Sequence, residues 1–491
     1  MKAKIGFLVL LVLVLCVGLC ACGEPEPSPE SLVTELAGVM TAEEIKGLDV
    51  YENLVSLDLR GSECYDAILA YTAAHPAVDV RYDVAVAGQR LDSRTESAEI
   101  DASACGELAS AAKYLPKLQS ITVSGDVSRD ALGALSAACP DAEIRYCVDI
   151  LGTAFPFDVT ELDLSDADGA DVDALIDRLA LLPELNTVQL QKEDGSCLLG
   201  FEDFARLADA FPDVFFQYSF TLFNQTVSTD MTELYYTLEP IGNRGVDEFY
   251  TYLPYLPRLS YLRLDRCGIK DNEKLDALNK AFPDTEVVWR VYMGEYDSFT
   301  DAEMIWLNAG VNDELVLPLK YCTKCRYLDM GHCDIHNIDF CNYMPDLEVA
   351  IFALGPLENI DPLANCPKLE YLEIYATCVS DLSPLVNCKE LQHINFGSLY
   401  TIKDISPLYD LTKLKRCRSV SSGVPVEQQI EIQQLLPECD CAFGQEESSA
   451  GNWRRDEGGN YVERYALLRQ QFKYDNHEGV SRHYLYDIDV D

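Results

Sequence analysis

Apolar residues recur along the C-terminal half of the chain in the phrase L-x-x-L-x-x-L-x-L. Its second position falls, at steps of 22, 22, 22 and 23 residues, on Cys325, Leu347, Leu369, Leu391 and Leu414. The apolar residues that alternate at the end of each phrase predict a short strand with one buried face. This period over five copies predicts a solenoid, in which each repeat buries its apolar face against the next.

Short proline-containing segments separate the copies, namely Asn359–Leu363, Ser380–Leu385 and Lys403–Leu408. In each, we expect Asp or Ser to cap a short helical turn, Pro to stand near its first position, and Leu to enter the core. From 320 to 443 the sequence resembles the 22-residue leucine-rich repeats of bacterial surface proteins of the internalin type. It departs from them in one position. The asparagine expected three residues after each L-x-L is replaced by Cys333, Gly355, Thr377 and Leu399.

The N-terminal half repeats a longer unit. Strands are predicted at Leu118–Val123, Leu185–Leu190 and Leu259–Leu264. Each is followed by a helix that ends, at steps of 72 and 71 residues, at Cys139, Phe211 or Phe282. A hairpin is indicated where Val287–Met293 alternates before a glycine. We therefore predict an α/β fold, a leucine-rich-repeat solenoid from about 41 to 443. Its stacked repeats would share one continuous core and a curved parallel β-sheet, with helices and turns on the convex side.

The first residues have the pattern of an export signal. Lys2 and Lys4 precede an apolar run from Ile5 to Leu19. Leu19-Cys20-Ala21-Cys22 resembles the lipobox of bacterial lipoproteins, which implies that Cys22 carries lipid. The alternative is an uncleaved transmembrane anchor, since the 18 residues from Ile5 to Cys22 can just span a bilayer. Both interpretations place the rest of the chain on the extracellular side of the membrane.

The last segment ends the repeat pattern. Tyr461, Tyr465, Leu468 and Phe472 stand at helical spacing, which predicts a helix that caps the last repeat. A partner-binding tail is the alternative. The expected organisation is a signal peptide at 1–21, a Pro/Glu-rich tether at 22–40, long repeats at 41–318, 22-residue repeats at 319–443, and an acidic linker with the capping helix at 444–491.

Charge narrows the possible partners. The chain has 82 acidic and 38 basic residues, a formal net charge of −44. Such a surface repels phosphate backbones, so we expect no nucleic-acid ligand. Together with the resemblances, it suggests a solvated, monomeric surface lipoprotein of a Gram-positive, clostridial-like bacterium, held to the membrane by its N-terminal lipid.

Two patterns resemble metal sites. Cys322 and Cys325, with His332, Cys333 and His336 nearby, have a zinc-like spacing. The two cysteines are also the repeat's own L-x-x-L positions, so both thiols should enter the core as small hydrophobes. The acidic run Asp163–Asp173 resembles a calcium loop, but apolar Leu164 and Leu175 occupy its first and twelfth ligand positions. We expect Asp171 to cap a helix instead, and predict no metal or other cofactor; opportunistic calcium binding and isolated disulfides stay open.

Signatures of catalysis are missing from the sequence. It contains no G-x-S-x-G, H-E-x-x-H or P-loop, and its six histidines are scattered. We therefore expect no catalytic residues and a protein that is not an enzyme. A pair of carboxylates acting as in glycosidases remains open, as does an enzyme in the N-terminal half.

The positions that flank the buried leucines should line the concave face, because side chains alternate along a strand. They include in-register tyrosines flanked by acids and closing on two arginines, a composition enriched at interfaces. We predict that this stripe binds a protein or a surface glycan; the rival is an envelope spacer without a dedicated ligand. The stripe consists of Tyr261, Arg263, Asp265, Tyr327, Asp329, Val349, Ile351, Tyr371, Glu373, Tyr375, His393, Asn395, Arg416 and Arg418.

Overall fold

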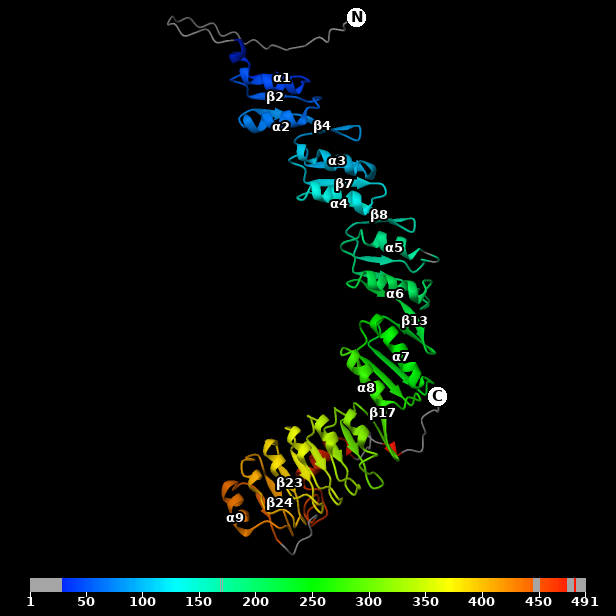
Figure 1. The fold of residues 1–491 in the computed structure, drawn as a ribbon, viewed down its shortest axis with the longest axis vertical. Helices are drawn as coiled ribbons and strands as arrows, with labels where there is room; N and C mark the ends of the chain where they lie inside the picture. The colour runs from blue at the N-terminus through cyan, green and yellow to red at the C-terminus, as the bar shows by residue number, and fades with distance from the viewer. Residues whose placement is uncertain (1–28, 168, 170, 445–450, 475–480, 483–491) are drawn as a thin grey trace, which may run out of the picture. The chain divides into compact units, whose positions relative to one another are not determined.

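The computed structural model describes residues 29–167, 169, 171–444, 451–474 and 481–482. Strand–helix repeats follow one another along the chain (Figure 1) and group into two units, Met1–Tyr218 and Ser219–Asp491. Within the described residues, no helix is both long and apolar enough to cross a bilayer.

The first unit is built from three long repeats, each with three parallel strands and two α-helices. The first contains β1 (Glu35–Ala37), α1 (Ala42–Lys46), β2 (Ser56–Asp58), α2 (Tyr65–Ala74), β3 (Asp79–Arg81) and the hairpin β4 (Asp83–Val86) and β5 (Gln89–Asp92). The second contains β6 (Ser97–Asp101), α3 (Cys105–Ala111), β7 (Ser120–Ser124), α4 (Arg129–Ala138), β8 (Glu143–Ile150) and β9 (Thr153–Pro156). The third contains β10 (Glu161–Asp163), α5 (Val172–Leu179), β11 (Thr187–Gln189), α6 (Phe201–Ala210) and β12 (Phe215–Gln217). Short 3-10 turns, η1 to η4, lie at Pro29–Leu32, Gly47–Val50, Ala102–Ala104 and Ala112–Tyr114.

The second unit begins with a hairpin and one more long repeat. These are β13 (Ser219–Leu222), β14 (Gln225–Ser228), β15 (Glu233–Thr237), α7 (Gly242–Tyr252), η5 (Leu253–Tyr255), β16 (Tyr261–Asp265), α8 (Asn272–Ala281), β17 (Glu286–Met293) and β18 (Tyr296–Phe299). The backbone of β26 (Ser481–Arg482) pairs antiparallel with β18. The predicted helix ends are confirmed, because α4, α6 and α8 each end one residue before the predicted position.

The 22-residue repeats form one seven-stranded parallel sheet. Its strands are β19 (Met304–Trp306), β20 (Tyr327–Asp329), β21 (Val349–Ile351), β22 (Tyr371–Glu373), β23 (His393–Asn395), β24 (Arg416–Arg418) and β25 (Asp440–Ala442). Four 3-10 turns and a helix alternate with them after η6 (Leu317–Tyr321), namely η7 (Asp339–Tyr343), η8 (Asp361–Asn365), η9 (Ser383–Asn387), η10 (Ser406–Leu408) and α9 (Val426–Leu435). In register, Leu328, Ala350, Leu372, Ile394 and Cys417 form a fully buried column. The predicted α/β leucine-rich-repeat fold is thus confirmed.

The parallel sheet is interrupted in the long repeats, and the hairpin predicted after Val287–Met293 is confirmed by β17 and β18. Strands β8 and β17 are each eight residues long; the first half of each pairs in parallel and the second half turns into an antiparallel hairpin. The turn after β8 has positive φ at both central residues, Leu151 (53°) and Gly152 (83°), as a two-residue hairpin requires. Each long repeat therefore closes its own short sheet before the next begins.

The turns of the 22-residue repeats follow the prediction. Asp381 Oδ1 accepts from the Ser383 amide at 2.8 Å, and Asp404 Oδ1 from the Ser406 amide at 2.9 Å. Where the asparagine ladder is missing, backbone bonds to the next repeat hold the turn. The left-handed Ala376 (φ 54°) donates its N–H to the Gly397 carbonyl at 2.9 Å. Leu354 and Ser398 have positive φ at the equivalent positions, one repeat before and after.

Cysteines occupy the core as predicted. Cys322, Cys325, Cys366, Cys388 and Cys417 are all fully buried. Of the sixteen cysteines in the described part of the chain, ten are buried and only two are exposed. Cysteine therefore acts in these repeats as a small hydrophobic side chain.

Candidate functional site

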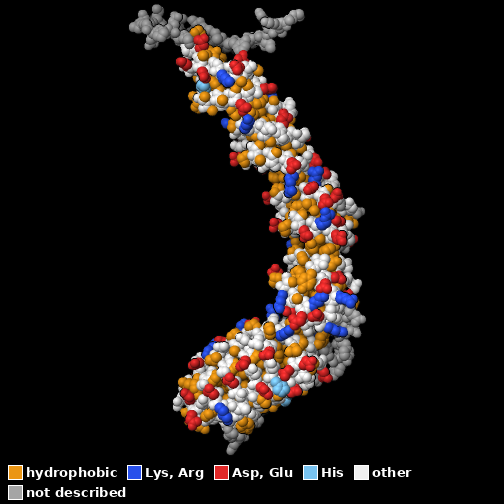
Figure 2. Space-filling model, in the orientation of Figure 1, with side chains coloured by type: hydrophobic (Ala, Val, Ile, Leu, Met, Phe, Trp, Pro, Cys, Tyr) orange, Lys and Arg blue, Asp and Glu red, His pale blue; other side chains and the backbone are white. Residues whose placement is uncertain are grey.

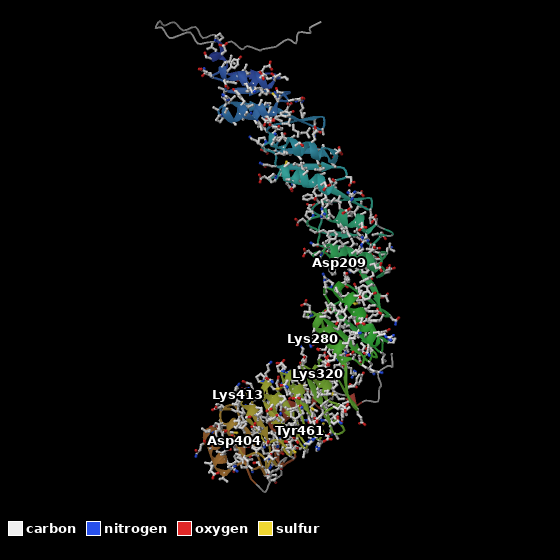
Figure 3. The ribbon with its side chains drawn as sticks, viewed as in Figure 1. Asp209, Lys280, Lys320, Asp404, Lys413 and Tyr461 are labelled. Carbon is white, nitrogen blue, oxygen red and sulfur yellow. The ribbon has the colours of Figure 1, made fainter. Side chains whose placement is uncertain are left out.

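Residues 451–474, which we call the C-terminal segment, lie along the concave strands of the 22-residue repeats. The segment contains α10 (Glu463–Gln471). Its buried residues pack with strand residues into one apolar cluster that includes Met304, Tyr327, Val349, Ile351, Tyr371, Trp453, Tyr465, Leu468 and Phe472. Tyr461 is labelled where the segment crosses the repeats (Figure 3). The expectation that this helix caps the last repeat is wrong, because its apolar residues bury against the middle of the sheet.

A buried carboxylate anchors the segment. Glu373 on β22 is fully buried, and its Oε1 accepts from Trp453 Nε1 at 2.9 Å and from the Tyr371 hydroxyl at 2.6 Å. Arg454 adds a two-pronged ion pair, with Nε 2.8 Å from Oε1 and Nη2 2.5 Å from Oε2. Burial lowers the pKa of Arg454, but the charge and hydrogen bonds of Glu373 outweigh it and raise that pKa above its usual value.

Further polar contacts secure the two ends of the segment. Arg416 donates from Nη1 to the Trp453 carbonyl at 3.0 Å, and its guanidinium lies 4.9 Å from the Trp453 ring centroid. At the other end, the Tyr474 hydroxyl donates to Asp329 Oδ2 at 3.3 Å. Burial raises the pKa of Asp329 to about 6, against the opposing charge of Arg454. Arg464 of α10 forms an ion pair with Glu370.

The predicted stripe is therefore largely covered by the chain itself. We expected exposed side chains, but the following stripe residues are buried: Tyr327, Asp329, Val349, Ile351, Tyr371, Glu373, Tyr375, Asn395 and Arg418. His393 is half-buried, and burial lowers its pKa to about 4, helped by the nearby charges of Arg464 and Arg416. Arg416 is half-buried too. A ligand role for these residues stays a prediction.

The first three stripe residues lie in a different sheet. Tyr261, Arg263 and Asp265 are on β16, which pairs with β15 and β17 and not with the 22-residue repeats. The Tyr261 hydroxyl donates to Asp301 at 2.8 Å, and Asp265 accepts from Arg290 Nε at 2.7 Å. The stripe is thus not continuous along the strands.

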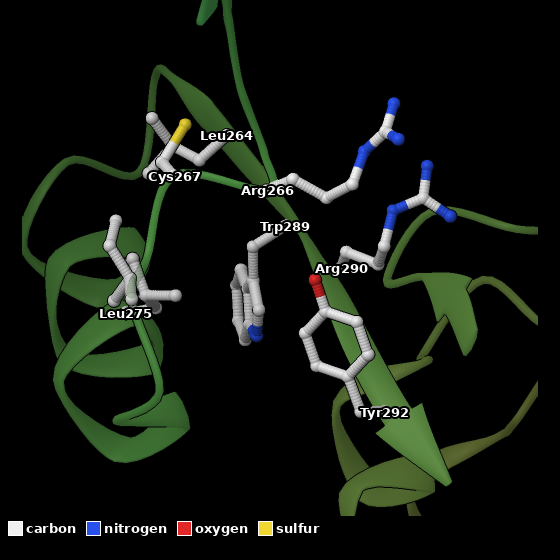
Figure 4. Close-up of a pocket in the computed structure, with 8 residues that line it drawn as sticks. Leu264, Arg266, Cys267, Leu275, Trp289, Arg290 and Tyr292 are labelled. Atoms are coloured by element: carbon white, nitrogen blue, oxygen red, sulfur yellow. The ribbon is translucent and has the colours of Figure 1, made fainter. Parts of the chain in front are cut away.

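A small cavity lies behind β16, beside Trp289 and Arg290 (Figure 4). Its volume of about 10 Å³ is roughly that of one water molecule. It is too small for a ligand.

A larger cavity of about 540 Å³ is formed by the C-terminal segment, with Tyr375 as the one lining residue from the repeats; we call it the arginine–tyrosine groove. It is lined by five aromatic residues (Tyr375, Trp453, Tyr461, Tyr465, Tyr474), three arginines (Arg454, Arg455, Arg469), Asn452, Asp456, Glu457 and two glycines. A second cavity of about 210 Å³ shares Tyr375, Arg454 and Tyr474 with it and adds Trp306, Asn308, Asp329, Gly331, His332, Ala353 and Leu354. The two cavities are therefore neighbours.

The sequence analysis did not identify the groove's arginines and outer tyrosines. Arg455, Tyr461, Arg469 and Tyr474 all belong to the C-terminal segment, which the helical spacing assigned to the end of the solenoid. One sequence feature could have revealed the covering segment, namely the apolar residues Val349 and Ile351 at positions of β21 that were predicted to face solvent. Two apolar side chains on an exposed face indicate that another part of the protein packs over them.

The resemblances to metal sites do not bring ligands together. Cys322 and Cys325 are fully buried, and burial raises the pKa of both thiols, that of Cys325 to about 12. His332 and His336 are exposed, and His336 pairs with Asp313 at 3.2 Å. Among the described residues, no three His, Cys, Asp or Glu side chains are placed to share a metal ion.

The acidic run Asp163–Asp173 ends in a helix cap as predicted. Asp171 Oδ1 accepts from the Asp173 amide at 3.0 Å and from the Ala174 amide at 3.4 Å. Leu164 and Leu175 are buried. Residues 168 and 170 of the run lie outside the described residues.

Acidic side chains are spread over the visible face of both units and form no single patch (Figure 2). The C-terminal segment differs from this background, with five basic against three acidic residues. The C-terminal segment is therefore slightly basic within an acidic chain.

Comparison with known proteins gives only remote likenesses. No protein-family model matches the chain, and no curated protein does. Among solved structures, an internalin (inlF) of Listeria monocytogenes is 15% identical, with 85% of this chain and 82% of that chain covered and a TM-score of 0.26. Internalin C2 of the same species is 20% identical over 45% of this chain and 85% of that one, with a TM-score of 0.26. A leucine-rich-repeat protein of Leptospira interrogans is 12% identical over 84% and 97%, with a TM-score of 0.27.

The class of the protein rests on its own structure. Parallel strands repeat every 22 or 23 residues, with a buried column in register and a 3-10 turn between successive strands. The chain is a leucine-rich-repeat protein whose concave face is covered by its own C-terminal segment.

Proposed function

We propose that the chain is a lipid-anchored binding protein on the outer face of a Gram-positive, clostridial-like cell membrane. Its ligand, a protein or a surface glycan, would bind at the arginine–tyrosine groove. The observation that carries this proposal is the groove itself, about 540 Å³ in volume, whose lining includes the half-exposed Tyr461 and Tyr474 and the exposed Arg455. Sites of this size with a few convergent polar groups are typical of ligand binding.

The outward location follows from the N-terminal pattern. Lys2 and Lys4, the apolar run and the small Ala21 before Cys22 support export and lipidation. Cys22→Ala should leave an unprocessed precursor and abolish labelling by a fatty-acid probe, whereas Cys20→Ala should leave both unchanged. Labelling that persists in Cys22→Ala would refute the assignment. Two or three acyl chains would hold the protein firmly, which one chain alone would not.

Capture experiments test the binding role. The full chain, purified in detergent, is immobilised and exposed to surface extracts of bacterial and host cells. Tyr461→Ala should reduce capture of the retained component, because this half-exposed ring lines the groove. The matched control is Tyr400→Ala, an exposed tyrosine of the same unit that does not line it. Equal capture by both variants would show that the ligand does not bind at the groove.

A further inference from the structure

Three cysteines meet at the last strand pair of the 22-residue repeats. Cys417 on β24 and Cys441 on β25 stand opposite each other in register, so Cys441 continues the column of inward side chains. Cys439 lies two residues before Cys441. The thiols of Cys417 and Cys439 are both within hydrogen-bonding distance of the Cys441 sulfur. The column thus ends in a cluster of three thiols gathered around Cys441.

The position of Cys441 sets this cluster apart from the other core thiols. Cys366 Sγ donates to the Cys341 carbonyl at 3.6 Å, Cys388 Sγ donates to the Leu363 carbonyl at 3.4 Å, and both residues are fully buried. Buried thiols of this kind are inert. Cys441 is only half-buried, and in the part of the chain that the structure describes β25 pairs with β24 alone. A reagent from solution can therefore reach Cys441.

The surroundings of Cys441 also favour its thiolate form, which is the nucleophile in thiol chemistry. Hydrogen bonds from Cys417 and then from Cys439 lower the pKa of Cys441 below its usual value, against the opposing effect of burial. The adjacent carboxylate of Asp440 does not stand alone against this thiolate, since Arg416 Nε lies 3.6 Å from Asp440 Oδ2.

Strand geometry decides which thiol can bridge to Cys441. Neighbouring strands lie about 4.8 Å apart, within the range of about 4.4–6.8 Å between the Cα atoms of a disulfide. Cys417 meets this condition because it is the in-register partner of Cys441. Residues two apart on one extended strand are about 6.6 Å apart, near the upper limit, so Cys439 is the poorer partner.

We propose that Cys417, Cys439 and Cys441 form a thiol–disulfide exchange site, which an external disulfide oxidises to a Cys417–Cys441 bridge. The Cys441 thiolate attacks one sulfur of the external disulfide, forms a mixed disulfide and releases the other half as a thiolate. The Cys417 sulfur, its proton passing to solvent, then attacks the Cys441 sulfur and releases the second half. Two protein thiols lose two electrons and two protons, and the external disulfide gains them and becomes two thiols.

The bridge would fasten the end of the solenoid. It closes a loop that contains α9 and joins β25 to β24 (Figure 1). Arg416, the residue before Cys417, donates to the Trp453 carbonyl of the C-terminal segment. The oxidised strand pair therefore carries one of the contacts that hold this segment on the concave face.

Peptide mapping of the full chain in detergent tests the proposal. The reduced protein is exposed to glutathione disulfide at pH 6, where an ordinary thiol is only about 0.3% ionised. Cleavage after Arg418 and before Asp440 places the three cysteines on separate peptides. We expect Cys417 linked to Cys441, formed at least about tenfold faster than glutathione adducts of the exposed Cys147 and Cys378.

The matched control is the pair Cys366 and Cys388, which stand 22 residues apart at equivalent positions of neighbouring repeats and should stay reduced. In Cys441→Ser, Cys417 and Cys439 should stay reduced as well, because both are buried. Oxidation should slow hydrogen exchange in α9 about 100-fold in the wild type and leave it unchanged in Cys441→Ser. The wild-type map stands even if the variant does not fold.

Three outcomes of the map would overturn the proposal. These are a Cys439–Cys441 link in place of Cys417–Cys441, a reaction of Cys441 no faster than that of Cys147 and Cys378, or equal oxidation of Cys366 and Cys388. Unchanged exchange in α9 after complete bridging would show that the bridge does not fasten the end of the solenoid.

Discussion

Removing the carboxylate of Glu373 should release the C-terminal segment without unfolding the repeats. In Glu373→Ala, Arg454, the Trp453 indole N–H and the Tyr371 hydroxyl lose their shared acceptor. Deleting one partner of a buried ion pair costs about 3–5 kcal/mol. The Arg454 side chain is 33% exposed and can turn toward water, so the lower end, about 3 kcal/mol, applies.

Hydrogen exchange measures this directly. A loss of about 3 kcal/mol in the local opening free energy corresponds to exchange about 100-fold faster for the amides of α10. Amides of the buried strand β22 should keep most of their protection, since the backbone bonds to β21 and β23 remain. Limited proteolysis should cut the segment in the variant first.

Glu370→Ala provides the matched control. Glu370 lies one residue before β22 and pairs with Arg464 of the same segment, but it is 28% exposed. Partly exposed pairs contribute about 1 kcal/mol or less, so exchange should rise by no more than about fivefold. Equal effects of the two substitutions, or an unchanged α10 in Glu373→Ala, would refute the view that the buried carboxylate anchors the segment.

Three further predictions concern stability and access. The folded-state pKa of His393 is about 4, below its ordinary 6.5, so its contribution to stability is present above pH 6.5 and lost as pH falls toward 4. Denaturant titrations should therefore show His393→Gln gaining up to about 3 kcal/mol relative to wild type across that window, and parallel curves would contradict this. Ala376→Gly should raise the free energy of unfolding by about 1 kcal/mol, because Ala376 has a φ of 54°, which glycine adopts without steric cost. A decrease in the free energy of unfolding would show that the backbone at this turn is not strained. A thiol reagent should label Cys147 and Cys378 rapidly in the native protein and the ten buried cysteines only after denaturation; rapid native labelling beyond the six that are not buried would contradict their burial.

The 22-residue repeats could be predicted because several independent sequence features indicate the same structure. The strand positions, the proline turns and the cysteines in leucine positions all point to one buried column. The hairpin after β17 was predicted from the alternation before a glycine, but the one after β8 was less accessible. Strand β8 continues its alternation through Ile150, and only the positive φ at Leu151, unusual for leucine, reveals where the chain folds back.

The site was only partly predictable. Tyr371 and Glu373 were selected as surface residues because they flank the inward leucines, and strand geometry does place them on the concave face. Their burial depends on the C-terminal segment, which is about 80 residues away in sequence. Its apolar residues are compatible both with a helix that caps the last repeat and with a segment that covers the concave strands. Whether a carboxylate such as Glu373 is exposed or paired cannot be decided from a local pattern, since it depends on the distant Arg454 and Trp453.

The C-terminal segment also sets an order of assembly. Strands of the 22-residue repeats pair with partners only 22 to 24 residues away, such as Tyr371 with His393. The bonds that form the groove join residues 81 positions apart, at Glu373 and Arg454, and 145 apart, at Asp329 and Tyr474. Because closing long loops is slow, the repeats can form early and the groove last. A chain that emerges gradually from the ribosome would thus expose the apolar strand β21 until residues 451–474 arrive, and the groove would form only then.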